Sequence, residues 1–415
     1  MATATASHSI RPLRHRILTP LRDFINDSRS TGVLLIGCTI VSLLIANTGG
    51  SWYTNGWKTS FPGTAAYHLP ASPLEWINNF LMAFFFLLAG MEIKRELTNG
   101  ELSTFKKAIL PFGAALGGML IPALIYCLFN LHTPHAHGWG IPTATDIAFS
   151  LGIASLLGKR FPVGLKILLM ALAIIDDLGA IVIVTLFYGG HVNGWWLMTA
   201  GILYSLLLLS NFTRLKFNYL QVFLGLGLWY AMLQSGIEAS ITGVLFALAT
   251  PVKNLAVIEK FIHKPVNFFI LPLFALANTA IILPDNIFGA LGTSVSMGVL
   301  FGLVIGKPVG IFLVSRIMVA CNIAQLPSNT KWEQLLGMGT LAGIGFTMSI
   351  FTTMLAFKEE QFRDIARISV LLAVVASVVV SLIYFRLIGG RFPAQSVLHS
   401  QSQPQQQPDL GLNAA

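Results

Sequence analysis

The sequence predicts an all-α polytopic membrane protein with about 12 transmembrane helices. Of the 415 residues, 54% are hydrophobic and 10% are charged, whereas soluble domains carry about 25% charged residues. Apolar runs of about 18 residues or more, long enough to cross a bilayer, recur along the whole chain. The expected spans lie near residues 31–47, 75–97, 107–130, 142–157, 163–188, 193–211, 216–234, 237–250, 265–284, 290–320, 333–357 and 367–389.

The positively charged residues orient these spans across the bilayer. Most of the 26 Lys and Arg residues fall in the alternate connections that share the side of the N-terminus. Because cytoplasmic loops carry the excess of Lys and Arg, both termini are expected in the cytoplasm. The residues left on the external side are Lys58, Lys358, Arg363 and Arg367. Membrane insertion therefore explains the net charge of +9, and no nucleic acid partner is expected.

The chain is expected to divide into three parts. They are a basic cytoplasmic N-terminus over residues 1–30, a transmembrane domain over 31–390 and a disordered, polar cytoplasmic tail over 391–415. The external connection 48–74 is long and rich in Gly, Trp, Tyr and Thr. We expect this connection to be either a structured element, such as a hairpin that contacts a second subunit, or a disordered loop.

Four ionisable residues lie where charge is most costly, inside apolar spans. They are Asp146, Asp176, Asp177 and Lys307. A charged side chain at the centre of a bilayer costs roughly 2.5–3.5 kcal/mol on insertion scales, so such residues usually face a bundle interior or a wet cavity and have a function. A buried ion pair that only fixes helix packing is the structural alternative. That alternative pairs one aspartate with Lys307 and leaves two acids unexplained.

Asp176 and Asp177 stand side by side in "AIIDDLGAIVIV", residues 173–184. Successive helical residues point about 100° apart, so one acid can line a cavity while the other faces an adjacent helix. Oxygen ligands suit protons or a small hard cation such as Na⁺ or Li⁺, and one site cannot hold both at once. Soft-metal chemistry is not expected, because the cysteines have no ligand-like spacing.

Two spans carry residues that interrupt a membrane helix. Asp146 follows Gly, Pro and Thr residues in "GIPTATDIAFSLGI", and "LAGIGFTMSIF" contains Gly343, Gly345 and Thr347. Transporters place such breaks at their binding sites, where helix ends and free carbonyls reach the substrate. Spans 3–5 and 10–12 are therefore expected to be repeats of opposite orientation, with broken fourth and eleventh helices. Glycines spaced by four, which allow close helix packing, occur at Gly113, Gly117, Gly302, Gly306 and Gly310.

The segments "TATDIAF", "AIIDDLGAI", "GKPVG" and "GIGFTMSIF", in this order and spacing, resemble the NhaA-type sodium/proton antiporters. "MEIKREL" and "ILPLFALAN" match the same family, and the resemblance covers roughly residues 15–390. It implies an inverted-repeat fold with crossed, broken fourth and eleventh helices in the bacterial inner membrane. It also implies electrogenic, pH-regulated exchange of cytoplasmic Na⁺ or Li⁺ for external H⁺, in pH and sodium homeostasis. No cofactor is implied, and a homodimer formed through residues 48–74 is compatible with the family.

The same resemblance assigns roles to individual residues. Asp177 and Asp176 look like the carriers of Na⁺ or Li⁺ and of protons, and Asp146 would balance charge where the broken helices cross. Thr145 would add an oxygen ligand, and Lys307 looks like the charged partner of Asp176. The residues that match or neighbour the pH-sensing cluster of the family, a cytoplasmic funnel, are Glu92, Lys94, Arg95, Glu96, Glu259, His263 and Lys264. A membrane-interface anchor is the alternative interpretation of that cluster.

For two polar segments, the resemblance does not assign a role directly. "LQSGIEAS" carries Gln234 and Glu238 where similar family members often have histidines, so the pH response at this position stays open. "HTPHAHG" contains His132, His135 and His137 in an external loop, without a nearby carboxylate or cysteine. Loop histidines are the favoured interpretation of this segment over a metal site.

Three other functions were weighed against antiport. A proton-coupled carrier of another small solute would need a roomier pocket with mixed polar and aromatic lining, whereas the polar residues here are mostly carboxylates and small side chains. An intramembrane aspartyl protease would place its two acids on separate helices, one of them in a Gly-x-Gly-Asp motif that this chain lacks. A passive channel is disfavoured because carboxylates beside a lysine favour tight binding and exchange over conduction.

Overall fold

The computed structural model describes residues 30–389 apart from residues 101, 191, 211–218 and 328–329. Throughout these residues the regular elements are helical and no strand occurs, as the sequence predicts. Of the predicted divisions, the basic N-terminal region up to residue 29 and the tail over 391–415 lie outside the described residues.

Seven helices in the described part of the chain are long and apolar enough to cross a membrane. They are α2 (Ser30–Thr48), α4–η2–α5 (Pro73–Trp76, Ile77–Leu81, Met82–Asn99), α6 (Phe105–Asn130), α8 (Val163–Phe187), α12–η6–α13 (Val252–Pro265, Val266–Ile270, Leu271–Asn278), α15–η7–α16 (Ser294–Phe301, Gly302–Gly306, Lys307–Ala320) and α19 (Glu360–Gly389). The helices α17 (Trp332–Ala342) and α18 (Phe346–Ala356) form a bent pair with an angle of 49° between them, and taking the pair as one span gives eight.

The remaining helices are shorter. They are α3 (Ser51–Lys58), η1 (Thr64–Tyr67), η3 (Ala136–Thr143), α7 (Ile147–Leu156), η4 (Gly158–Arg160), α9 (Gly194–Ser210), α10 (Tyr219–Ser235), η5 (Ala239–Ile241), α11 (Thr242–Ala249) and α14 (Ile287–Leu291). Several of the expected spans correspond to these shorter helices. The count of about 12 spans and the inverted repeat therefore stay predictions.

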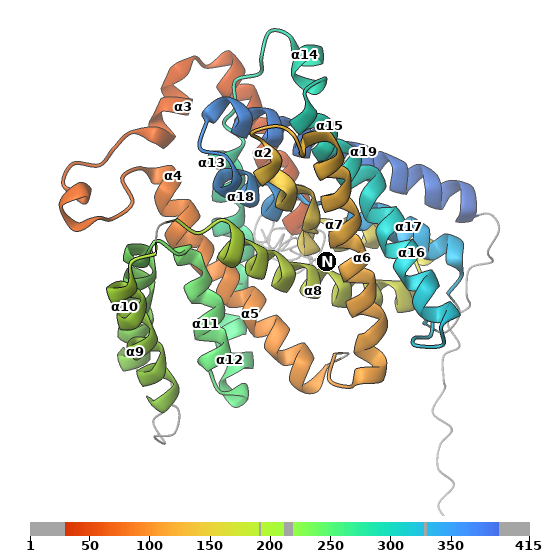
Figure 1. Ribbon diagram of the computed structural model, residues 1–415, viewed down its shortest axis with the longest axis horizontal. Coiled ribbons are helices and arrows are strands. Elements are labelled where there is room, and N and C mark those ends of the chain that lie inside the picture. Colours follow the sequence, from red (N-terminus) through yellow and green to blue (C-terminus); the bar gives the residue numbers. More distant parts are fainter. Residues whose placement is uncertain (1–29, 101, 191, 211–218, 328–329, 390–415) are drawn as a thin grey trace, which may run out of the picture.

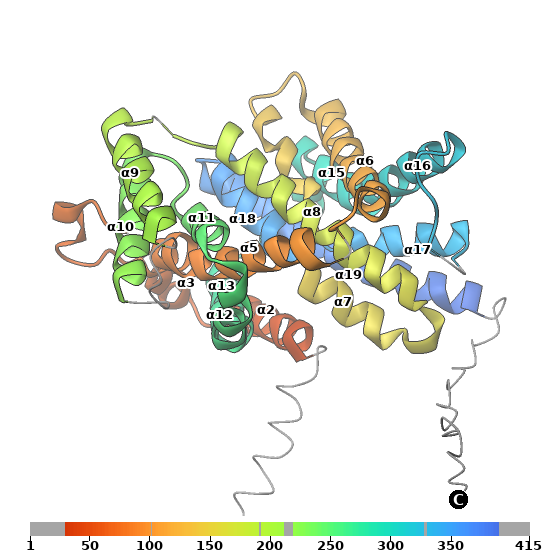
Figure 2. The ribbon, with the colours of Figure 1, turned by 90° about the horizontal axis from the view of Figure 1, so that it is seen from below.

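The helices are arranged around α8, which runs through the centre of the molecule in both views (Figures 1 and 2). The helices α9 and α10 lie side by side at one edge, and α16 and α17 lie at the opposite edge. Because α8 carries Asp176 and Asp177, its central position places both acids in the interior, where Asp176 is 0% and Asp177 is 3% exposed.

Two glycines predicted to allow close helix packing lie at the contact between α6 and α16. A Cβ atom built on Gly310 would lie 2.1 Å from the carbonyl oxygen of Gly117, and one built on Gly117 would lie 2.3 Å from the carbonyl oxygen of Gly310. Only residues without a side chain permit this backbone-to-backbone approach. The contact holds α16 against α6 three residues beyond Lys307, and thereby helps to fix the depth of the lysine.

The two interrupted segments cross each other in the middle of the molecule. Residues 144–146, which precede α7, are not helical, and Gly343–Gly345 separate α17 from α18. The backbone N–H of Asp146 donates a hydrogen bond of 2.7 Å to the carbonyl oxygen of Ile344. A break in a helix leaves backbone N–H and C=O groups without partners in the helix. Here a backbone group of one break is hydrogen-bonded to a backbone group of the other.

The possible hairpin in segment 48–74 was a wrong expectation. The segment contains the helix α3 and the short helix η1 instead. Its conformation is fixed within the subunit, because the Tyr53 hydroxyl donates a hydrogen bond of 3.0 Å to Ser42 Oγ on α2 and Lys58 forms an ion pair with Glu360 on α19. The sequence could not reveal the pairing of Lys58 with Glu360, which is 302 residues away along the chain. The homodimer through this segment stays a prediction.

Candidate ion-binding site

Asp146 lies where the two interrupted segments cross. Its Oδ1 accepts a hydrogen bond of 2.9 Å from the N–H of Phe149 at the start of α7. Its Oδ2 accepts bonds of 3.1 Å from the N–H of Thr347 and 2.7 Å from the Thr347 hydroxyl, at the start of α18. The first N–H groups of a helix lack partners within the helix and carry partial positive charge. One carboxylate thus serves the N-terminal ends of both helices, a position that suits a charge-balancing role.

Asp176 and Lys307 contact each other in the interior. The Lys307 ammonium donates a hydrogen bond to Asp176 Oδ2, and both side chains are fully buried. The ammonium also donates a bond of 2.6 Å to the Thr145 hydroxyl, whose oxygen lies 2.7 Å from Asp176 Oδ2 and 2.9 Å from the carbonyl oxygen of Ala342. The single hydroxyl proton serves one of these two acceptors at a time. The network joins α8, α16 and both interrupted segments.

A local irregularity of the helix precedes the lysine. The segment Gly302–Gly306 is π-helical and ends directly before Lys307. Such π-helical turns inside longer helices occur frequently at functional sites. Here the segment leads the chain into the position from which the lysine reaches the aspartate.

Asp177 has different surroundings from its neighbour. Its side chain lines an internal cavity, while neither Asp176 nor Lys307 belongs to the cavity lining. Its Oδ1 is buried and accepts a hydrogen bond from none of the described residues. A buried carboxylate oxygen without a donor is costly, so this oxygen is available to a proton or a cation. The adjacent acids therefore face different partners, as the 100° rotation between helical neighbours predicts.

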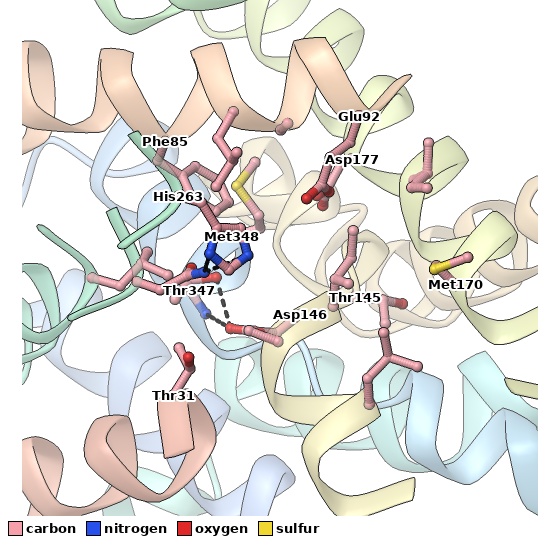
Figure 3. A pocket seen from close by; sticks show the side chains of 18 of the residues that line it. Thr31, Phe85, Glu92, Thr145, Asp146, Met170, Asp177, His263, Thr347 and Met348 are labelled. Atoms are coloured by element: carbon pink, nitrogen blue, oxygen red, sulfur yellow. Dashed lines mark hydrogen bonds between the residues drawn. The ribbon is translucent and has the colours of Figure 1, made fainter. Parts of the chain in front are cut away.

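The cavity has a volume of about 230 Å³ and lies between α2, α5, α7, α8, α12–α13 and α18. Figure 3 shows the aspartates on its wall, with the hydrogen bonds between Thr347 and Asp146 drawn as dashed lines. The polar residues of the lining are Thr31, Glu92, Arg95, Thr145, Asp146, Asp177, His263, Asn267 and Thr347. Of these, Thr145, Asp146 and Asp177 are predicted ion-binding residues, and Glu92, Arg95 and His263 are predicted pH-sensing residues.

The predicted pH-sensing residues separate into two groups. Glu92, Arg95 and His263 line the cavity. Arg95 also forms a hydrogen-bonded ion pair with Glu259, and its Nε lies 3.9 Å from Glu96 Oε1. Lys94 is placed differently, because its ammonium donates hydrogen bonds to the carbonyl oxygens of Leu248 and Thr250 at the end of α11. Cations stabilise the C-terminal end of a helix, so this contact suits a structural role for Lys94.

Thr347 is a functional candidate that was named from the sequence only as part of an interrupted segment and not as a site residue. The residue was visible as part of the interrupted segment "LAGIGFTMSIF", but its partner Asp146 is 201 residues away. The only available signal was the expectation that the two interrupted segments cross. The histidines of "HTPHAHG" show aromatic packing, since the ring centroid of His135 lies 3.8 Å from that of Phe362 and the ring centroid of His137 lies 5.1 Å from that of Tyr188.

The chemistry of the site follows from its donor atoms. Asp146, Asp177 and Thr145 contribute carboxylate and hydroxyl oxygens to one cavity, a set that suits a hard cation. An acid with an unbonded oxygen can also take up a proton. Proton binding and cation binding would therefore compete at the carboxylate of Asp177.

Comparison with known proteins places this arrangement in a family. The model of the family described as Na⁺/H⁺ antiporter 1 matches residues 22–385. The chain is 43% identical to a Na⁺/H⁺ antiporter NhaA 1 of Clostridium beijerinckii over 388 residues, which cover 91% of this chain and 97% of the relative. It is 45% identical to the antiporters NhaA of Flavobacterium psychrophilum and Dechloromonas aromatica, over 85% and 86% of this chain and 92% of each relative.

These matches and the apolar helices agree on a multi-pass bacterial membrane protein. The family match begins before α2 and ends within the last turns of α19, and so includes the cavity and both interrupted segments. The chain belongs to the NhaA family of Na⁺/H⁺ antiporters.

Proposed function

We propose that this protein exchanges cytoplasmic Na⁺ or Li⁺ for external H⁺ across the bacterial inner membrane and serves pH and sodium homeostasis. Its relatives are named as Na⁺/H⁺ antiporters, and secondary transport rather than catalysis of a covalent reaction is the activity proposed for this chain. Both termini face the cytoplasm in this proposal, because the excess of Lys and Arg falls on that side. The cavity beside Glu92 and Arg95 is then the cytoplasmic access to the site.

Asp177 is the central residue of the proposed mechanism. The observation that carries this assignment is its buried, unbonded Oδ1 on the wall of the cavity. A cation entering from the cytoplasm binds this carboxylate, with Thr145 and Asp146 supplying further oxygen atoms nearby. A proton on the same carboxylate removes its charge and one of its lone pairs. Proton and cation therefore exclude each other, and this competition couples the two fluxes.

Asp176 and Lys307 form the second proton-linked element of the mechanism. Their direct contact neutralises two charges in the interior. When a cation approaches Asp177, its positive charge opposes that of the nearby ammonium and favours release of a proton from the pair. Two protonatable elements at one cation site allow more protons than cations to be exchanged per cycle. Such exchange moves net charge and is electrogenic.

The charged cluster at the cavity entrance supports regulation by pH. Glu92, Arg95 and His263 lie on the path to Asp177, and Glu259 holds Arg95. Protonation of acids at this entrance changes the local attraction for cations. Glu96 contributes through its contact with Arg95, and Lys94 through the position that it gives to α11. This regulatory role remains separate from the exchange step at Asp177.

A proton-coupled carrier of another small solute is the second candidate. The cavity of about 230 Å³ is smaller than the pockets of about 300–1,000 Å³ that usually bind small organic molecules. Its polar lining also consists mainly of carboxylate, hydroxyl and amide groups. Both features favour a bare cation over an organic solute.

Reconstituted proteoliposomes test the proposed function. Addition of Na⁺ or Li⁺ on the side that corresponds to the cytoplasm should move protons in the opposite direction, and addition of K⁺ or choline should not. A membrane potential of either sign should change the rate if the exchange is electrogenic. Proton movement that is indifferent to Na⁺ but follows an organic solute would favour the second candidate.

A further inference from the structure

The helix α5, which forms one wall of the cavity, is fixed to α11 and α12. A Cβ atom built on Gly243 of α11 would clash with the carbonyl oxygen of Ala83 on α5, so the two backbones lie in direct contact. At the other end of α5, Arg95 forms its ion pair with Glu259 of α12. These contacts make α5, α11 and α12 one packed group of helices.

The helix α18, which forms the opposite wall, belongs to a different group. Its Thr347 hydroxyl donates a hydrogen bond of 2.7 Å to Asp146, and its Ser349 hydroxyl donates one of 2.8 Å to the carbonyl oxygen of Ile141 in η3. α18 also packs against α8 and α19. Since the cavity lining includes residues of α5, α12, α7, α8 and α18, the cavity lies at the boundary between the two groups.

The rings of Phe86 on α5 and Phe351 on α18 contact each other across this boundary. Their centroids lie 5.4 Å apart with an angle of 65° between the planes, and the residues are 2% and 1% exposed. In chain order, Phe85 is the first residue of α5 in the cavity lining and Met348 is the last of α18. In the proposed orientation α5 runs inward and α18 runs outward, so the two rings lie at the external end of the cavity.

Two buried aromatic rings oppose the passage of a cation. The contact offers no polar atom, so a cation that crossed it would lose water without gaining a ligand. The ring contact itself contains no hydrogen bond, whereas hydrogen bonds and close backbone contacts hold each wall to its own group. The ring contact can therefore open while both groups of helices remain intact.

We infer that Phe86 and Phe351 form an external barrier, the apolar contact that closes the cavity toward the outside while Asp177 is accessible from the cytoplasm. The inference rests on the proposed function, because exchange requires the cation to leave on the external side. The two rings separate when the site faces outward. They are positioning residues that prevent Na⁺ from crossing the protein without exchange for H⁺.

A cysteine in the cavity measures access from the outside without any transport measurement. Ala89 lines the cavity and is 7% exposed. In a background without the three native cysteines, Ala89→Cys should react slowly with a membrane-impermeant thiol reagent added outside. Phe86→Ala and Phe351→Ala should each accelerate this labelling about tenfold, the factor expected for loss of an aromatic contact. The double variant should add little, because either change alone breaks the same contact.

Matched variants separate the barrier from general loosening. Phe161 and Phe385 form a buried ring contact of similar geometry, with centroids 5.3 Å apart and an angle of 65°, and neither residue lines the cavity. Phe161→Ala should therefore leave the labelling of Ala89→Cys unchanged. Phe351→Leu keeps a large apolar side chain and should keep labelling slow. Phe351→Val removes less volume than Phe351→Ala and should still accelerate labelling, so it provides the test if the alanine variant does not fold.

Sodium flux provides an independent measurement. In proteoliposomes, the double variant Phe86→Ala with Phe351→Ala should release trapped Na⁺ several-fold faster than the parent, without opposing proton movement. The reason is that a cavity open to the cytoplasm becomes a continuous path once its external end is also open. Phe161→Ala should show no such leak.

The outcomes distinguish this inference from the proposed function. Equal labelling of Phe86→Ala, Phe351→Ala and the parent would overturn the barrier, and so would equal acceleration by Phe161→Ala or Na⁺ release that stays coupled to protons in the double variant. Each of these results leaves antiport intact if the parent still exchanges Na⁺ for H⁺. Accelerated labelling in both barrier variants of a parent that shows no exchange would keep the barrier and refute the proposed function.

Discussion

The Lys307 ammonium donates a hydrogen bond to Oδ2 of Asp176, and both side chains are fully buried. The next residue along α8, Asp177, lines the cavity without taking part in this pair. The pair explains why the chain carries two adjacent acids where one is already costly. The buried Oδ1 atoms of both aspartates lack a donor among the described residues. Asp176 is neutralised by Lys307, whereas Asp177 lines the cavity, where its oxygen is available to ligands. Mutation can test this division of roles between Asp176 and Asp177.

Asp177→Asn should abolish Na⁺-dependent proton movement in everted vesicles. The amide is nearly isosteric but neither binds a proton near neutral pH nor attracts a cation with a full charge. Asp285→Asn is the matched control, because this aspartate is exposed and does not line the cavity. Retained exchange in Asp177→Asn, at the rate of the control, would remove Asp177 from the mechanism.

Lys307→Ala should destabilise the protein by about 3–5 kcal/mol, the usual cost of leaving one partner of a buried ion pair without the other. The double variant Asp176→Asn with Lys307→Met should recover much of that loss, because it leaves no unpaired charge. Thermal unfolding of the purified variants measures both effects. A double variant as unstable as Lys307→Ala would contradict this explanation, because the loss would then not come from an unpaired buried carboxylate.

Thr347→Val should destabilise the crossing by about 1.5–3 kcal/mol, the contribution of a hydrogen bond to a charged group. The change removes the hydroxyl donor to Asp146 Oδ2 and keeps the shape of the side chain. We also expect a higher Na⁺ concentration at half-maximal exchange, since Asp146 lines the same cavity as Asp177. Thr352→Val, a buried threonine on the same helix, is the control, and an equal effect of both changes would contradict the role of Thr347.

Gly310→Ala should cost about 1–3 kcal/mol through overpacking. The new Cβ atom would lie 2.1 Å from the carbonyl oxygen of Gly117, so α16 must move away from α6 and carry Lys307 with it. Exchange should fall along with stability. Gly201→Ala on α9 meets no atom within 4 Å and should be neutral or slightly stabilising. A neutral result for Gly310→Ala would mean that the two helices can separate without affecting the site.

The site residues that could be identified from the sequence are those that conflict with their local surroundings. Three acids and a lysine in apolar spans, and glycines within expected helices, conflict with their surroundings, and such conflicts concentrate at functional sites. This reasoning identified Asp146, Asp176, Asp177 and Lys307. The hydrogen bonds of Asp146 were not predictable in detail, because Thr347 looks ordinary until the two interrupted segments are brought together.

The tertiary partners of surface charges were equally hidden. Lys94 and Arg95 are neighbours in "MEIKREL" and look alike in the sequence, yet Lys94 binds carbonyl oxygens of α11 while Arg95 faces the cavity. The difference arises from the direction in which each side chain leaves α5, and that direction matters only once α11 is packed against α5. Likewise, part of segment 48–74 forms α3, and no local sequence pattern predicts the contacts of α3 with α2 and α19.

In the proposed mechanism, protons and Na⁺ compete for one carboxylate site built on Asp177. Proton release from the purified protein in weakly buffered detergent solution, measured on addition of Na⁺, Li⁺ or K⁺, tests it most directly. Na⁺ and Li⁺ should release protons, K⁺ should not, and Asp177→Asn should release none. Absence of release with Na⁺ in a protein that still performs exchange, or equal release from Asp177→Asn, would contradict the claim.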